Sequence, residues 1–195
     1  MKSWLRSFNI YLLAAGTVIA GGCSSVPRLS ANKDYATLSI FMEGRPADSL
    51  PVQIGWNKTT IYIEGAVPVL TEEDLGMARL VDNADGSYEV QLTFTDHGEK
   101  LLEMNTIGKQ GKHLVIFAKY RPKGWKEPEG GAPAAEEKPQ PGQPRMIFWL
   151  AAPLIPQNGI TNGSLRFTPE ASHEEAERIV LGLNNMAKAR HKVEE

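Results

Sequence analysis

The sequence predicts an α+β fold, in which a mostly antiparallel sheet carries about three helices packed on one face. Short segments of alternating apolar and polar residues, the spacing of β-strands, recur along the chain. Three other segments combine a helix-start signal with apolar residues three and four positions apart, the spacing of an amphipathic helix. The connections between these segments are short, which favours helices layered on a sheet within one domain.

The clearest expected strand spans residues 88–94, where every second residue from Tyr88 to Phe94 is apolar and points to the same face. The run from 113 to 120 is more uniformly apolar, and we expect it to be a buried strand. Shorter strands are expected at residues 36–44, 52–56, 60–63, 145–152 and 163–167.

The expected helices run from Thr71 to about Val81, from Thr95 or Asp96 to Gly108, and from Thr168 to about Arg190. In the first, Thr71 and Asp74 have the spacing of a capping box, with Asp in place of the usual Glu. In the last, Thr168 is the predicted cap and Pro169 takes the first helical position, where proline is favoured.

Residues 1–22 are typical of a secretory signal peptide. Lys2 and Arg6 precede a short apolar run, and small residues end it at Gly22, directly before Cys23. This arrangement resembles the lipobox of bacterial lipoproteins, in which the signal peptide is cut before a cysteine that carries acyl chains such as palmitate. The resemblance implies cleavage between Gly22 and Cys23 and lipidation of Cys23. The alternative is a plain secreted protein.

The mature chain would begin with a polar segment, residues 23–35, which we interpret as a flexible tether with a reach of roughly 40 Å. A single domain is expected over residues 36–190. Proline and glycine make up ten of the 24 residues at 121–144, a composition that forms no core. We expect a disordered excursion between two neighbouring strands, with Trp125 as a candidate partner-binding residue.

The charge and cysteine content exclude several classes of protein. The net charge of −2 becomes −4 once Lys2 and Arg6 leave with the signal peptide, which excludes a basic nucleic-acid-binding protein. One cysteine excludes a disulfide framework and any cysteine-based zinc site. The turn at 82–86 does not fit a calcium loop, because the first ligand position would be Val81 and no Glu closes the loop twelve positions on. We therefore expect no metal and no cofactor.

No catalytic motif is present in the sequence. The four histidines, His97, His113, His173 and His191, occur singly. The acids Glu72, Glu73 and Asp74 are explained by a favourable interaction with the dipole of the first expected helix. We expect no catalytic residue; a hydrolase is the minor alternative.

An ordered series of short motifs resembles the head region of the first periplasmic domain of SecD, in the SecD/SecF protein-export family. It covers about residues 65–185, and residues 36–64 lie outside it. The motifs are Thr71, Asp74, Leu75 and Ala78; Leu92-Thr93-Phe94-Thr95 with Gly98; Thr106; Gly111-Lys112; Ala152-Pro153-Leu154-Ile155; Ile160-Thr161-Asn162-Gly163; and Phe167-Thr168. The resemblance implies the fold and a surface that binds extended polypeptide.

Together these features predict a lipid-anchored, non-catalytic module of the cell envelope that binds exported polypeptide or an envelope protein. The candidate surface is the sheet edge beside the 121–144 segment, where an extended peptide would add as a strand. Ser24 follows the cysteine, and by resemblance to Gram-negative lipoproteins this residue favours sorting of the protein to the outer membrane, where it would face the periplasm. The alternative is an envelope-assembly partner that binds one folded protein through Trp125.

Overall fold

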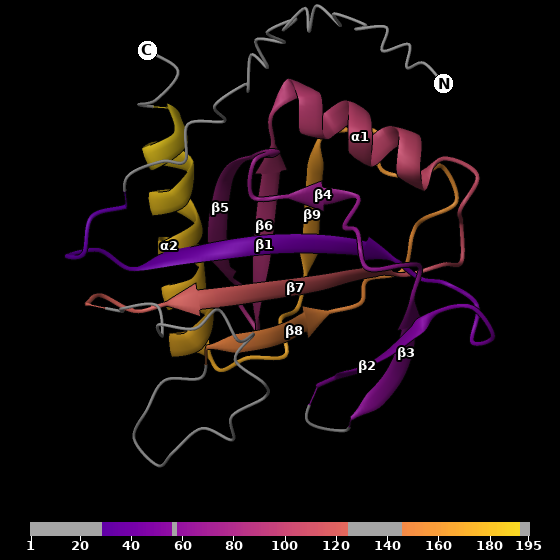
Figure 1. Ribbon diagram of the computed structural model, residues 1–195, viewed down its shortest axis with the longest axis horizontal. Helices are drawn as coiled ribbons and strands as arrows, with labels where there is room; N and C mark the ends of the chain where they lie inside the picture. Colours follow the sequence, from indigo (N-terminus) through magenta and orange to yellow (C-terminus); the bar gives the residue numbers. More distant parts are fainter. Residues whose placement is uncertain (1–28, 56–57, 125–145, 192–195) are drawn as a thin grey trace, which may run out of the picture.

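The fold is described from a computed structural model for residues 29–55, 58–124 and 146–191. This part of the chain forms two helices and nine strands, and every strand pairing in it is antiparallel, which confirms the α+β class (Figure 1). The helices are α1 (Asp96–Thr106) and α2 (His173–His191). The strands are β1 (Tyr35–Met42), β2 (Leu50–Ile54), β3 (Thr59–Ile63), β4 (Leu70–Thr71), β5 (Leu75–Asp82), β6 (Tyr88–Phe94), β7 (Leu114–Arg121), β8 (Ile147–Ala151) and β9 (Ser164–Phe167).

The strands are divided among three sheets, where the sequence predicts one. The largest has the order β4-β1-β7-β8, the second has the order β5-β6-β9, and β2 and β3 form a separate hairpin. In Figure 1, β1, β7 and β8 run across the front of β5, β6 and β9. The main core lies between these two sheets and takes residues from both and from both helices.

Alternation in the strands and periodicity in α2 supply this core. Leu38 and Ile40 of β1, Leu92 of β6, and Ile179 and Leu183 of α2 belong to this one core, and each residue is at most 1% exposed. Burying a side chain of this size contributes about 1.5–3 kcal/mol to folding. The apolar spacing predicted for the last helix is therefore confirmed at these positions.

Helix α2 lies against both β1 and β5, where the two large sheets approach each other. It comes closest to β1 at Gly182, where an added Cβ would lie 2.7 Å from the backbone nitrogen of Ala36. Two residues on, the side-chain amide of Asn184 pairs with the backbone of β5. Its Oδ1 accepts from Ala78 N–H at 3.0 Å and its Nδ2 donates to Ala78 C=O at 2.9 Å. This amide occupies the outer edge of β5.

The β2–β3 hairpin covers part of the outer face of the largest sheet. Its apolar side, including Ile54 and Ile63, packs on Phe41 and Val115 in a second, smaller core. Trp149 of β8 extends this cluster, with its ring centroid 4.8 Å from that of Phe117 and 6.0 Å from that of Phe41. Residues 36–64, outside the SecD resemblance, thus form β1 and a hairpin that is packed onto it.

The helix predicted from Thr71 to Val81 is wrong: the chain makes a turn and then forms β5. The predicted reciprocal contact does form in part, because Asp74 Oδ2 accepts from Thr71 N–H at 2.9 Å. Thr71 Oγ1, however, accepts from Glu73 N–H, two residues on, at 3.3 Å. A single polar turn uses the same residues as a capping box, and antiparallel pairing with β6 makes the next segment a strand. The described chain therefore has two helices, not about three.

The last helix starts four residues later than predicted, because its first residue is His173 and not Pro169. Ser172 and Glu175 form the capping box, since Ser172 N–H donates to the Glu175 carboxylate at 2.8 Å and Glu175 N–H to Ser172 Oγ at 3.3 Å. Thr168 and Pro169 lie before the helix. The start predicted for the second helix is confirmed, with Thr95 as its N-cap.

Both ends of the predicted 121–144 excursion adjoin paired strands, because β7 and β8 are antiparallel neighbours. Most of that segment lies outside the described residues. The end of the predicted 23–35 tether is bound to the body: Asp34 accepts from Lys123 N–H at 2.7 Å through its carboxylate and from Asn185 Nδ2 at 2.9 Å through its carbonyl.

Candidate functional site

The residues predicted for lipidation, cleavage and partner binding, Cys23, Gly22 and Trp125, lie outside the described residues, so these assignments stay predictions. The last described residue before Trp125 is Gly124, whose N–H donates to Ala31 C=O at 2.8 Å. This part of the described chain therefore ends beside the end of the predicted tether.

Three of the four histidines lie beside a carboxylate, each a different one. The distance from a ring nitrogen to the carboxylate is 3.9 Å for His97 and Asp74, 2.7 Å for His113 and Glu43, and 2.9 Å for His173 and Asp82. No contact between two histidines occurs in the described chain, and the side chain of His191 lies outside it. The structure thus places these histidines in separate surface pairs and not in one site.

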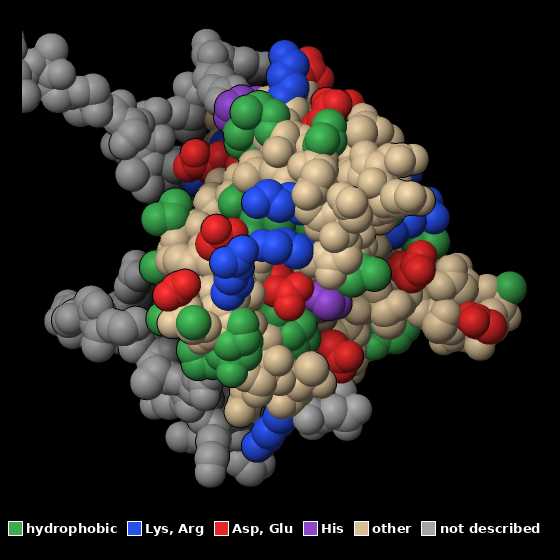
Figure 2. All heavy atoms as spheres, turned by 90° about the vertical axis from the view of Figure 1, so that its right-hand side faces the viewer, with side chains coloured by type: hydrophobic (Ala, Val, Ile, Leu, Met, Phe, Trp, Pro, Cys, Tyr) green, Lys and Arg blue, Asp and Glu red, His purple; other side chains and the backbone are tan. Residues whose placement is uncertain are grey.

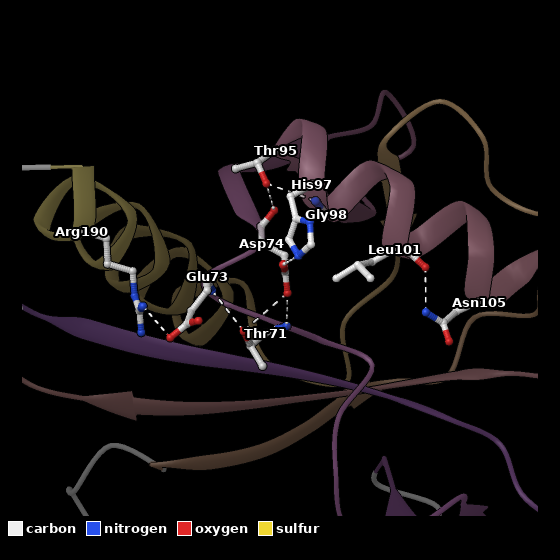
Figure 3. Close-up of polar contacts among 9 residues, drawn as sticks. All are labelled: Thr71, Glu73, Asp74, Thr95, His97, Gly98, Leu101, Asn105 and Arg190. Carbon is white, nitrogen blue, oxygen red and sulfur yellow. Dashed lines mark hydrogen bonds and ion pairs between the residues drawn. The ribbon is translucent and has the colours of Figure 1, made fainter. Parts of the chain in front are cut away.

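The acids Glu72, Glu73 and Asp74 form a junction between elements, and Figure 3 shows Glu73 and Asp74 with their partners. Glu72 accepts from Leu38 N–H at 3.2 Å and pairs with Arg190 at 3.2 Å, and Glu73 pairs with the other terminal nitrogen of Arg190 at 2.7 Å. These contacts join β1, the turn before β5 and the C-terminal end of α2. The helix-dipole explanation for these acids is wrong, because no helix begins there.

Asp74, the third of these acids, joins the turn before β5 to the start of α1. Its carbonyl accepts from Thr95 N–H at 2.8 Å, and its carboxylate lies between Thr71 and His97 (Figure 3). In a hydroxyl–histidine–acid triad the histidine stands between the other two groups and takes the hydroxyl proton. Here the acid stands in the middle, and Thr95 Oγ1 is already used to cap Gly98 N–H at 3.2 Å. This geometry holds elements together and has no nucleophile–base order.

The Glu43–His113 pair has the shortest distance of the three. Glu43 Oε2 accepts from His113 N–H at 2.8 Å and lies 2.7 Å from Nδ1 of the same residue, while Lys112 Nζ donates to the Glu43 carbonyl at 3.2 Å. Burial alone would raise the pKa of Glu43, but the hydrogen bonds and charge of His113, with the charge of Lys112, lower it. The pair fastens the end of β1 to the start of β7.

No group of three or more His, Cys, Asp or Glu side chains suited to a metal ion occurs in the described part of the chain. Neither helix there is long and apolar enough to cross a membrane. On the side of the molecule seen in Figure 2, basic and acidic side chains alternate, and neither sign forms a continuous field.

The edge of β9 has outward backbone groups without a partner in the described chain. Phe94 N–H donates to Gly163 C=O at 2.9 Å, which makes Phe94 and Gly163 a hydrogen-bonded pair of the antiparallel ladder. Because such pairs alternate, Leu165 and Phe167 also bond toward β6, and the N–H and C=O of Arg166 point away from it. No described residue bonds to them. Arg166 itself is exposed.

The edge of β8, the one predicted from the sequence, is partly occupied. Tyr120 N–H donates to Met146 C=O, and by the same alternation Ile147 and Trp149 point their backbone groups outward. Next along the strand, however, Leu150 C=O accepts from Glu170 N–H at 2.6 Å, and the hairpin strand β2 lies against β8. Sequence reasoning missed β9 as an edge, because edges depend on the order of strands in space.

Comparisons with family models and with curated proteins give no match. Among solved structures the chain is similar to SecDF, described as a membrane component that enhances protein export, with a TM-score of 0.49, 24% identity, and coverage of 82% of this chain and 71% of that one. It is also similar to SecDF in a super-membrane-facing form (TM-score 0.47, 23% identity, 77% and 19% covered) and to SecDF from Thermus thermophilus (0.43, 23%, 78% and 20%). The chain spans about a fifth of the length of the latter two. The resemblance to SecD noted in the sequence is thus met again among solved structures.

Proposed function

We propose that this chain is a membrane-tethered, non-catalytic module of the bacterial envelope that binds extended polypeptide during protein export. The observation that carries the proposal is the β9 edge, where the N–H and C=O of Arg166 point outward without a described partner. A strand of another chain satisfies such groups by extending the ladder, whatever its sequence. Sequence-tolerant binding suits a module that meets many different chains in transit.

Described residues occupy positions on three other strands, which supports this choice. Asn184 occupies β5 at Ala78, and Glu170 bonds to β8 at Leu150. On the outer side of β1, Glu72 bonds to both backbone groups of Leu38. Natural proteins cover their sheet edges to prevent uncontrolled pairing, so an edge left open is a candidate for pairing that is selected.

The membrane-tethered part of the proposal depends on the signal peptide and Cys23. Residues 30–34 are bound to the body, so the free tether spans about seven residues from Cys23 and reaches roughly 24 Å. The domain would therefore stay close to the membrane surface. A chain crossing or leaving that membrane would meet the domain at short range, which is the setting that protein export requires.

The test uses the full-length chain, labelled with ¹⁵N in detergent micelles and titrated with a capped seven-residue peptide of alternating valine and threonine. Binding is followed by the amide signals of β9. Arg166→Pro removes only an outward N–H and the side chain, a change that edge strands tolerate. We expect it to abolish the shift changes at Leu165 and Phe167, whereas Arg166→Ala, which keeps the N–H, retains them.

Ile147→Pro is the matched control, because it removes an outward N–H from the β8 edge. Peptide binding that survives Arg166→Pro but is lost in Ile147→Pro would move the site to β8 and overturn the assignment to β9. If Arg166→Pro does not fold, hydrogen exchange of the unmodified chain decides the matter. We expect saturating peptide to slow exchange of the Arg166 amide, and an unchanged rate contradicts the proposal.

A further inference from the structure

The solvent face of the β5-β6-β9 sheet carries a row of three polar residues that ends at the open edge. The register places Arg79 of β5 opposite Gln91 of β6, and Gln91 opposite Arg166 of β9. Residues opposite each other on adjacent strands point to the same face. Both arginines are exposed, and Gln91 is half-buried between them. Arg166 is therefore the last side chain of a cationic row.

Gln91 holds the guanidinium of Arg166 on this face. Gln91 Nε2 donates to Ser164 Oγ at 3.2 Å, which fixes the amide, and Gln91 Oε1 accepts from Arg166 Nη2 at 3.1 Å. The other guanidinium donors have no partner in the described chain. Neither arginine forms an ion pair there, not even with Glu89, which lies one row away on the same face.

A strand added antiparallel to β9 places one residue directly opposite Arg166, with its side chain on the same face. That residue forms both backbone hydrogen bonds with Arg166 and completes the row. Its two neighbours point to the opposite face, on the side of the buried Leu165 and Phe167. The far end of the edge is less suited to an anion, because the Glu99 carboxylate packs against Gly163.

We propose that the β9 edge selects extended segments in which a single aspartate or glutamate, flanked by apolar residues, lies opposite Arg166. This inference depends on the proposed binding of extended polypeptide and adds its side-chain preference. The acid pairs with the guanidinium that Gln91 holds in place, and the apolar neighbours extend the buried face. An exposed ion pair is weak, so the preference is graded: every extended segment binds, and acidic ones bind more tightly.

The experiment compares three capped seven-residue peptides that differ only at the central residue, which is glutamate, glutamine or lysine between valines. Each is titrated into the full-length ¹⁵N-labelled chain. We expect the glutamate peptide to bind about two- to five-fold more tightly than the glutamine peptide, and the lysine peptide more weakly still. The ratio should fall toward one in 0.5 M NaCl, where the Debye length is only about 4 Å.

Two charge reversals complete the test. Arg166→Glu should invert the order of the three peptides, while Lys188→Glu, the same change of net charge at an exposed position on α2, should leave it intact. Three peptides that bind equally well to the unmodified chain, or an order that inverts in both variants, overturn the preference but leave the proposed function standing. If none of the peptides binds, the proposed function fails as well.

Discussion

Replacing Asn184 by alanine tests how the edge of β5 is closed. The amide makes two hydrogen bonds to Ala78, of 3.0 Å and 2.9 Å, across 106 residues of sequence, and Ala78 is only 2% exposed. Its loss leaves a donor and an acceptor without partners, at about 1–3 kcal/mol each when fully buried. Asn184 is itself half-buried, so water recovers part of this cost. We expect a net loss of about 2 kcal/mol.

The matched control is Asn185→Ala, at the next residue of the same helix. Asn185 makes one hydrogen bond, to Asp34 C=O at 2.9 Å. Both substitutions gain the same helix propensity, so this term cancels in the comparison. Urea unfolding should show Asn184→Ala to be less stable than Asn185→Ala by about 1 kcal/mol, and its melting temperature should be about 3 °C lower.

Hydrogen exchange gives the specific readout, because only Asn184→Ala should speed exchange of the Ala78 amide. Asn184→Asp adds a pH signature. Its carboxylate opposes Ala78 C=O at neutral pH, so its deficit should shrink as the pH falls toward about 4 and the acid becomes a donor. Two alanine variants of equal stability, with the Ala78 amide equally protected in both, would refute this account of the edge.

Three further predictions concern other parts of the chain. Cys23→Ser should abolish incorporation of labelled palmitate and release the protein from the membrane fraction, and label retained by the variant contradicts lipidation. Glu43→Gln should lower the free energy of unfolding above pH 4.5, the ordinary pKa of this group. The difference from the unmodified chain should disappear as the pH falls through the lower pKa of Glu43 in the folded state. A difference in unfolding free energy that stays constant from about pH 6 to about pH 3 rules this out. Replacing residues 123–142 by a short Gly-Ser linker should leave the fold unchanged or stabilise it by about 1 kcal/mol, and a melting temperature lower by more than about 10 °C would show a packed segment. If a pull-down from solubilised envelope recovers a binding partner with the unmodified chain but not with this variant or with Trp125→Ala, and the melting temperature is unchanged, Trp125 is the residue that binds the partner.

Local patterns predicted most strands well, but they gave one helix where the chain forms β5 and started another helix too early. The turn at Thr71 illustrates the physical reason. Asp74 bonds to Thr71 N–H just as a capping residue would, but one polar turn is also how a strand can begin. The next residues pair with β6, and the register shifts at Gly76. That irregularity hides the alternation of β5 from any short window, and the partner strand lies outside the window altogether.

The start of α2 shows the same competition between local and distant contacts. Thr168 and Pro169 carry a favourable start signal, and Ser172 with Glu175 carries another. The chain uses the second signal, because Glu170 N–H donates to Leu150 C=O of β8. This bond holds the segment before Ser172 against that strand. The open edge at Arg166 was likewise beyond local reasoning, since only the strand order leaves β9 without an outer neighbour.

The size of the β9 edge determines how the proposed module would work. Arg166 offers two outward backbone groups and Ser164 one more, its carbonyl, because its N–H is held by Asn162. At about 0.5–1.5 kcal/mol for each hydrogen bond, the edge gains at most roughly 4 kcal/mol, the equivalent of a millimolar dissociation constant. Such binding is too weak to capture a dilute chain. A short tether to the membrane raises the effective concentration of passing segments to about the same millimolar range, so weak contact suffices and release stays fast. Anchoring and a short edge are therefore complementary properties: loss of Cys23 should abolish contact with exported chains in cells and leave the peptide affinity in solution unchanged.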